Sequence, residues 1–214
     1  MNKTVVVIPT YNEAENLIAI TAALFALPVP ELEILIVDDA SPDGTGQLAD
    51  QLASQYPGRF HVMHRSGKQG LGTAYVQGFQ WAIQNGATAI IQMDADFSHN
   101  PNDLMYLYEA CLNGADLSIG SRYKSGVNVV NWPMKRMLIS YFASAYARFI
   151  TRMKIHDTTS GFMCFRRMVL DTINLDMIRF KGYTFQIELK FTAWNYGFNI
   201  VEVPIIFTGR KEST

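Results

Sequence analysis

The 214-residue sequence lacks several features that mark specialised classes of protein. It has two cysteines, Cys111 and Cys164, which are far apart in the sequence and form neither a disulfide framework nor a metal-spaced motif. We expect both to be reduced, partly buried thiols in a cytosolic protein. The formal net charge is −1, so the composition gives no support for a nucleic-acid groove, and we expect no nucleic-acid partner.

Long apolar runs are also missing. No run reaches the length needed to cross a bilayer, and the first residues enter a strand pattern at once, so we expect no signal peptide. A membrane role would therefore be peripheral. With 49% hydrophobic and 17% charged residues, and no repeat or obvious linker, the sequence predicts one globular domain over residues 1–214.

What is present is an alternation of two hydrophobic patterns. β-Branched runs typical of buried strands alternate with apolar residues at helical spacing. Strands are expected at residues 3–9, 33–37, 60–64, 87–92, 116–120, 162–165 and 199–207. Helices are expected at residues 13–27, 45–56, 72–85, 101–113, 132–153 and 183–196. This order predicts an α/β fold, in which a mainly parallel twisted sheet has helices on both faces.

Carboxylates follow three of the predicted strands. Glu13 comes after the first strand, Asp38 and Asp39 after the second, and Asp94 and Asp96 after the fourth. In a parallel sheet these ends lie along one edge, which is where ligands bind in open α/β sheets. Carboxylates there suit ribose hydroxyls and base N–H groups.

Asp94 and Asp96 alternate on an extended segment, so their carboxylates can converge on one point. A divalent cation such as Mg²⁺ or Mn²⁺ suits that point, and the alternative is a solvated loop with a helix-capping aspartate. The unit is not a dinucleotide-binding one, because Gly70-Leu71-Gly72 lacks the third glycine, and no Walker A lysine motif is present.

The second half of the chain supplies basic residues that suit an anion. Arginine binds phosphate in a bidentate way and lysine binds it as a point charge, although each residue on its own is a candidate for an ordinary surface charge. The candidates are Arg122, Arg136, Arg166, Arg167, Lys181 and Arg210. The helix expected at 132–153 interleaves such charges with apolar residues, so it either faces the core or lies at a membrane surface.

Several motifs together resemble one family. They are Pro9-Thr10-Tyr11-Asn12-Glu13, Asp38-Asp39-Ala40-Ser41-Pro42-Asp43-Gly44-Thr45, Gly70-Leu71-Gly72-Thr73-Ala74, Asp94-Ala95-Asp96-Phe97-Ser98-His99, Gly120-Ser121-Arg122-Tyr123 and Thr159-Ser160-Gly161-Phe162. Over nearly its whole length the chain resembles the family-2 glycosyltransferases, and more narrowly the dolichol-phosphate or polyprenol-phosphate mannose synthases. The resemblance implies a glycosyltransferase-A fold, with a nucleotide-sugar half at 1–120 and an acceptor half at 121–214.

The resemblance also implies an activity and a set of residues. The enzyme would transfer mannose from GDP-mannose to a polyprenyl monophosphate, inverting the anomeric carbon, with Mg²⁺ or Mn²⁺, at the cytoplasmic face of a membrane. Matching positions for the nucleotide sugar are Pro9, Tyr11, Glu13, Val37, Asp39, Asp94, Ala95, Lys181 and Arg210. Matching positions for the acceptor phosphate are Arg122, Arg136 and Ser140; for the metal Asp94, Asp96 and Ser98; and for catalysis Asp96, Arg122 and Asp157.

Two departures and several alternatives accompany this expectation. Ser98 stands where family members often carry glutamine, and Arg210 is followed by Lys-Glu-Ser-Thr in place of the family's usual glycine-containing ending. Asp157 is a candidate base or a turn residue, and His99 and His156 are expected to be structural or solvated. The alternatives are a UDP-glucose-dependent enzyme of the same kind, transfer to a glycan hydroxyl, and a binding module without catalysis.

Overall fold

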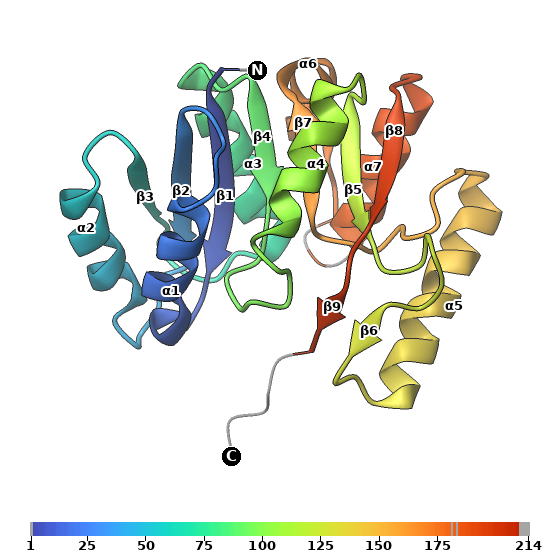
Figure 1. Ribbon diagram of the computed structural model, residues 1–214, viewed down its shortest axis with the longest axis horizontal. Coiled ribbons are helices and arrows are strands. Elements are labelled where there is room, and N and C mark those ends of the chain that lie inside the picture. Colours follow the sequence, from blue (N-terminus) through green and yellow to red (C-terminus); the bar gives the residue numbers. More distant parts are fainter. Residues whose placement is uncertain (1, 181, 183, 210–214) are drawn as a thin grey trace.

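The computed structural model describes residues 2–180, 182 and 184–209, and its strands and helices alternate through the first half of the chain (Figure 1). The strands are β1 (Thr4–Thr10), β2 (Leu32–Asp38), β3 (Phe60–His64), β4 (Ala89–Gln92), β5 (Leu117–Ser121), β6 (Val129–Val130), β7 (Met163–Arg166), β8 (Ile200–Pro204) and β9 (Phe207–Thr208). The helices are α1 (Ala14–Phe25), α2 (Thr45–Gln55), α3 (Leu71–Gln84), α4 (Asp103–Leu112), α5 (Met134–Thr151), α6 (Arg167–Thr172) and α7 (Thr184–Asn195), with a 3-10 turn at Leu175–Met177.

The central sheet has seven strands in the order β3-β2-β1-β4-β7-β5-β8. The pairs β1–β2, β1–β4, β2–β3 and β5–β8 are parallel, whereas β7 is antiparallel to both of its neighbours, β4 and β5. The mainly parallel sheet is therefore confirmed, and the reversed strand in its middle is a feature that the hydrophobic pattern did not predict.

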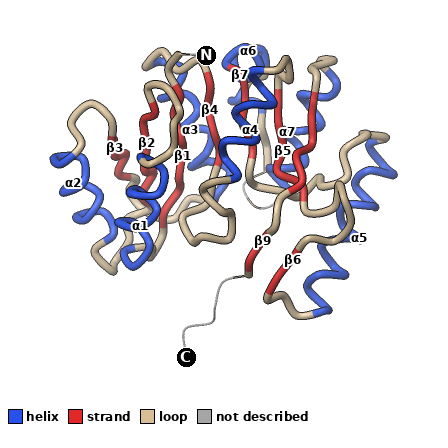
Figure 2. The backbone as a smooth tube through the Cα atoms, viewed as in Figure 1, coloured by secondary structure: helices blue, strands red, loops and turns tan. Residues whose placement is uncertain are grey.

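Helices cover both faces of this sheet, as expected (Figure 2). Because successive side chains of a strand point to opposite faces, Val6 and Ile8 of β1 pack with α1, α2 and α4, while Val5 and Val7 pack with α3, α6 and α7. Both apolar layers are fully buried at their centres. The sheet thus holds the ends of β1, β2 and β4 in a rigid frame.

Two expected element boundaries are wrong. Pro101 was expected at the first helical position, but α4 begins at Asp103 and Pro101 lies in the turn before it. The strand expected at 199–207 is divided into β8 and β9, because Pro204 lacks an N–H and Ile205 N donates instead to Ser121 O at 3.1 Å. Strand β8, which ends at Pro204, is an edge strand of the sheet, the position in which a proline is tolerated.

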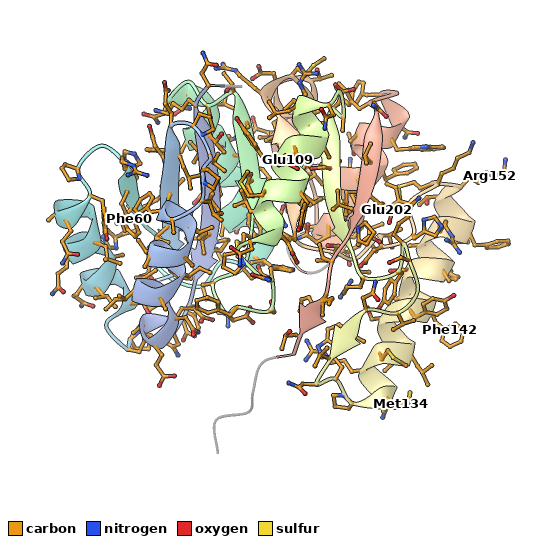
Figure 3. All side chains as sticks on the ribbon, in the orientation of Figure 1. Phe60, Glu109, Met134, Phe142, Arg152 and Glu202 are labelled. Atoms are coloured by element: carbon orange, nitrogen blue, oxygen red, sulfur yellow. The ribbon has the colours of Figure 1, made fainter. Side chains whose placement is uncertain are left out.

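Helix α5 stands apart from the sheet and exposes much of its apolar surface (Figure 1). Of its residues, Ser144 and Ala147 are buried, while Phe142, Tyr146 and Phe149 are 63%, 69% and 80% exposed. Figure 3 shows Phe142 on the outer side of this helix. An ordinary core-facing helix is therefore the wrong reading of this pattern. In the described part of the chain, no helix is both long enough and apolar enough to span a bilayer.

Candidate active site

The carboxyl ends of β1, β2 and β4 lie at one edge of the sheet, as predicted from the sequence. After each of these strands a non-glycine residue adopts a positive φ: Asn12 at 60°, Ala40 at 55° and Phe97 at 56°. Such backbone is strained for residues with a Cβ, and it lets the chain turn sharply after each strand. The turns bring the polar residues that follow the three strands to the same edge.

The loop after β2 is ordered by two aspartates. Asp38 accepts hydrogen bonds from Thr10 Oγ1 at 3.1 Å and from Ser41 Oγ at 2.6 Å. Asp43 accepts from Thr45 N at 3.0 Å and from Ala14 N at 3.1 Å, so it ties the start of α2 to the start of α1. The helix expected from residue 45 does begin at Thr45, and Gly44 before it lies in the left-handed region at φ 90°.

Asp39, a predicted nucleotide-sugar residue, forms an ion pair with Arg65, whose Nη1 lies 2.6 Å from Asp39 Oδ1. Arg65 Nη2 also donates to Thr73 Oγ1 at 2.6 Å. Burial raises the pKa of Asp39 above its usual value, and the charge of Arg65 offsets this only in part. Arg65 therefore joins the end of β2 to the beginning of α3.

Asp94, Asp96 and Ser98 follow β4, and all three line one cavity of about 650 Å³. The buried phenol of Tyr75 donates to Asp94 Oδ1 at 2.8 Å, and Ser98 N donates to Asp96 Oδ1 at 3.1 Å. Burial and the neighbouring Asp94 raise the pKa of Tyr75 well above its usual value, so Tyr75 remains a donor at neutral pH. These contacts fix the positions of the two carboxylates.

The donor set at this point suits a hard divalent cation. Asp94, Asp96 and the Ser98 hydroxyl offer oxygen ligands only, which Mg²⁺ and Mn²⁺ prefer. Within residues 2–180, 182 and 184–209, no group of three or more His, Cys, Asp or Glu side chains gathers around a possible metal position. A cation held here would therefore keep coordination sites for water and for phosphate oxygens.

The same cavity brings the predicted metal residues and the predicted phosphate residues together. Its lining contains six residues that the sequence had singled out from two distant regions: Asp94, Asp96, Ser98, Arg122, Arg136 and Ser140. Ser140 accepts a hydrogen bond from Tyr123 Oη at 2.8 Å. Carboxylates and guanidinium groups thus line the same cavity.

Among the described residues, the positions predicted for the nucleotide sugar other than Asp94 do not line this cavity. Pro9 and Val37 pair in register on β1 and β2, and the Val37 side chain is fully buried, so its contact with a nucleotide would have to use the backbone. Tyr11 is partly exposed, with Lys68 Nζ 4.3 Å from its ring centroid, and Glu13 and Ala95 are buried. Lys181 and Arg210 lie outside the described residues.

Arg122 and Asp157 form a buried, bidentate ion pair. Asp157 accepts from Arg122 Nε and Nη2, each at 2.7 Å, and from Arg122 N at 2.9 Å. Although burial on its own raises the pKa of Asp157, the hydrogen bonds and charge of Arg122 outweigh it and hold that pKa below its usual value. A carboxylate held in this way is a poor proton acceptor, and its geometry suits the orientation of Arg122.

Two further charged side chains hold the turn that carries Asp157. Glu202 Oε1 on β8 accepts from His156 N and from Asp157 N, both at 2.9 Å; Glu202 is labelled in Figure 3. From the other side, Lys190 Nζ on α7 donates to Thr158 O at 3.0 Å and to Ser160 O at 2.6 Å. The turn is thus fixed through its N–H groups by one side chain and through its carbonyl groups by the other.

Lys190 gives this region a measurable pH dependence. Burial lowers its pKa to about 7, and the nearby charge of Asp157 offsets this only in part. Since the unfolded chain retains a lysine pKa of about 10.4, it binds more protons than the folded protein between pH 7 and 10. We expect the unfolding free energy of the wild type, relative to Lys190→Met, to rise by about 2 to 4 kcal/mol from pH 7 to pH 10 in urea titrations. If the difference in unfolding free energy between the wild type and the variant does not change with pH, the lowered pKa of Lys190 is contradicted.

Trp132 lies close to both arginines of the cavity. Arg136 Cζ lies 4.4 Å and Arg122 Cζ 5.4 Å from the ring centroid of Trp132, and both distances are within the range of cation–π attraction. The indole attracts both guanidinium groups and so offsets part of the repulsion between them. Two guanidinium groups can therefore point into one cavity and bind a single anion.

His99 lines the cavity and is buried, with its ring stacked on Phe162 at 4.9 Å between centroids. Burial lowers its pKa, so its ring is neutral at pH 7. His156 pairs with Glu202 at 2.7 Å. The structural role expected for both histidines is consistent with these contacts, but residue spacing gave no sign that His99 faces the cavity. The same holds for Gln186 and Thr159.

Comparison with known sequences identifies close relatives. The chain matches the model described as glycosyl transferase family 2 over residues 5–173. It is 51% identical over 209 residues to a polyprenol monophosphomannose synthase of Mycolicibacterium smegmatis, covering 98% of this chain and 78% of that protein. It is 45% identical over 209 residues to an undecaprenyl-phosphate mannosyltransferase of Micrococcus luteus, covering 98% of this chain and 85% of that protein. A dolichol-phosphate mannosyltransferase of Pyrococcus furiosus is 38% identical over 208 residues, covering 96% of this chain and 56% of that protein.

Solved structures share the fold at low sequence identity. Glucosyl-3-phosphoglycerate synthase from Mycobacterium tuberculosis, in complex with Mn²⁺ and UDP-glucose, matches with a TM-score of 0.73 and 17% identity, covering 100% of this chain and 72% of that chain. A mannosyltransferase from Pyrobaculum calidifontis, in complex with GDP-Man and Mn²⁺, matches with a TM-score of 0.65 and 15% identity, covering 97% of this chain and 56% of that chain. The resemblance and the fold predicted from the motifs are confirmed: this chain is an enzyme with the glycosyltransferase-A fold, and it belongs to glycosyl transferase family 2.

Proposed function

We propose that this enzyme transfers mannose from GDP-mannose to a polyprenyl monophosphate, with inversion at the anomeric carbon. The observation that carries the proposal is the single cavity that joins Asp94 and Asp96 to Arg122 and Arg136. One side suits a cation and the diphosphate of a donor, and the other suits a second, anionic substrate. The names of the three relatives support mannose as the sugar and a polyprenyl phosphate as the acceptor.

An anionic acceptor also fits the low basicity of Asp157, the carboxylate that pairs with Arg122. A phosphate oxygen is already a nucleophile at neutral pH, so the protein needs to align it and to stabilise the departing GDP. Arg122, fixed by Asp157, and Arg136, stacked on Trp132, would hold the acceptor phosphate beside Ser140. A divalent cation, when bound by Asp94, Asp96 and Ser98, supplies charge neutralisation for the leaving diphosphate.

The test is a transfer assay with labelled donor. GDP-mannose and UDP-glucose are supplied separately with a short polyprenyl phosphate, in Mg²⁺, Mn²⁺ or EDTA. We expect transfer from GDP-mannose but not from UDP-glucose, and we expect EDTA to abolish it. Transfer from UDP-glucose in place of GDP-mannose would change the sugar assignment. In a parallel reaction with a neutral oligosaccharide as acceptor, transfer to its hydroxyl groups and none to the polyprenyl phosphate would overturn the acceptor assignment.

We further propose that α5 places the enzyme peripherally on a membrane surface. Its exposed Phe142, Tyr146 and Phe149 share the helix with Arg136 and Ser140 of the cavity, so docking would bring the cavity to the lipid headgroups. Replacing these three residues by serine is expected to weaken binding to anionic lipid vesicles by at least about tenfold, because each buried aromatic contributes more than 1 kcal/mol.

Vesicle co-sedimentation measures this effect, and transfer to a short soluble acceptor should change little. Tyr106→Ser with Leu112→Ser, two comparably exposed apolar residues on α4, is the matched control. Equal vesicle binding by the α5 variant, the α4 variant and the wild type would rule out α5 as the docking surface.

A further inference from the structure

Three polar groups surround Gly161 at the floor of the cavity. A Cβ built on Gly161 would lie 3.5 Å from Gln186 Nε2, 3.7 Å from Gln92 Nε2 and 3.8 Å from Asp94 Oδ2. These residues come from α7, from the last position of β4 and from the loop after β4. Gly161, Gln186 and Asp94 line the cavity, and Gln92 lies behind them, fully buried. We call this group of four residues the polar floor.

The two glutamines of the polar floor are not satisfied by the protein atoms around them. Gln92 Oε1, Gln92 Nε2 and Gln186 Oε1 are all buried without a hydrogen-bond partner in the described part of the chain. Folded proteins rarely leave buried amide groups unpaired, because these groups lose their hydrogen bonds to water. Gln186 is therefore placed to complete its hydrogen bonds with a group that enters the cavity, either directly or through an ordered water shared with Gln92.

Hydrogen-bonding rules limit the kind of chemical group that can pair with these two amides. Whichever way each amide is turned, its carbonyl needs a donor and its NH₂ needs an acceptor. A diphosphate oxygen only accepts hydrogen bonds, so it cannot pair with the amide carbonyl groups. A hydroxyl group both donates and accepts, and a sugar presents several of them.

We propose that the polar floor is the subsite that binds the hydroxyl groups of the transferred sugar, with Gln186 as its direct contact. The inference rests on the proposed function and deepens it. A sugar here would lie beside Asp94, next to the position proposed for the cation and the diphosphate, and in the same cavity as the arginines proposed for the acceptor. Amide groups that pair only with hydroxyls also discriminate between sugars, since a wrongly placed hydroxyl leaves them unpaired.

Gly161→Ala tests the subsite by filling it. The added methyl group would meet its neighbours at 3.5 Å or more, and Gly161 has no positive φ, so the fold should be retained. Gln186→Ala tests it by removing the contact. The exposed Gln84→Ala on α3 is the matched control for the loss of a glutamine.

The measurement is calorimetric binding of GDP and of GDP-mannose to the whole chain with Mn²⁺ and without acceptor, with thermal unfolding as a check of the fold. In Gly161→Ala and Gln186→Ala, the ratio of the dissociation constant of GDP-mannose to that of GDP should rise about tenfold, the usual size of a hydroxyl hydrogen bond to a buried group. GDP binding itself should stay within about twofold of the wild type, because neither Gly161 nor Gln186 is among the residues proposed for the cation or the nucleotide.

An unchanged ratio in both variants would overturn the subsite, as would an equal loss of GDP and GDP-mannose binding. Transfer by the wild type reports separately on the proposed function. If the wild type transfers mannose and both variants show the same ratio of dissociation constants as the wild type, only the subsite is overturned. A wild type that binds neither GDP-mannose nor UDP-glucose would remove both proposals.

Discussion

Asp96→Asn is expected to lower mannose transfer by about 10³-fold at saturating GDP-mannose, the size of effect seen when a group that stabilises developing charge is removed. Asparagine keeps the shape of the side chain but removes the negative charge that would hold the cation against the leaving diphosphate. Because Asp96 lines the cavity and is only partly buried, the fold should tolerate the change.

The assay is metal-dependent transfer of labelled mannose, together with calorimetric titration of Mn²⁺ in the presence of GDP. Asp171→Asn, an exposed aspartate in an i,i+4 pair with Arg167, is the control and should leave transfer unchanged. If Asp96→Asn keeps the metal dependence and rate of the wild type, the cation is held elsewhere and the proposed metal site is wrong.

Replacing Asp157 should have the largest effect on stability, because Arg122 would be left buried without its counter-ion. Removing one partner of such a pair usually costs about 3 to 5 kcal/mol of unfolding free energy, and we expect that range for Asp157→Ala in urea unfolding at pH 7. The pKa of Asp157 is lowered in the folded protein, so its stabilisation is present above its unfolded pKa of about 3.9 and is lost only as the pH falls below that value.

The kinetics of Asp157→Asn separate an orienting role from a base role. If Asp157 orients Arg122, the variant should raise the KM for the polyprenyl phosphate by about tenfold or more and leave the KM for GDP-mannose nearly unchanged. If Asp157 were a base, kcat would fall with both KM values unchanged. A double-mutant cycle with Arg122→Met would measure the coupling, and a coupling near zero would contradict the ion pair seen in the structure.

Local sequence patterns predicted most elements of the fold, because strand and helix periodicity are local signals. The run at residues 60–64 corresponds to β3 as Phe60–His64, and the acidic residues after β1, β2 and β4 do lie at one edge. The position of β7 could not be predicted in this way. Strand order depends on pairing between distant segments. The hydrophobic pattern of Met163–Arg166 is the same whether the strand runs parallel or antiparallel to its neighbours.

That Asp94, Asp96 and Ser98 would lie together was predictable for the same reason, since they are neighbours in the chain and all three line the cavity. The contacts made by α7 were not. Its residues Gln186 and Lys190 are polar, and helical spacing alone does not show that both are buried. From the sequence, Asp157 was a candidate base or a turn residue. Its ion-pair partner, Arg122, lies 35 positions away in the chain, so only the folded structure shows their contact.

The reversed strand β7 also determines the order in which the molecule can be assembled. It lies between β4 and β5 and pairs Gln92 with Met163 and Ile119 with Met163, so residues from the second half of the chain complete a sheet begun by the first half. During synthesis, β4 must keep an unpaired edge until residue 166 has emerged, since long loops have to close before this pairing forms. The halves 1–120 and 121–214 therefore differ in the ligands proposed for them, but they cannot complete their strand pairing independently.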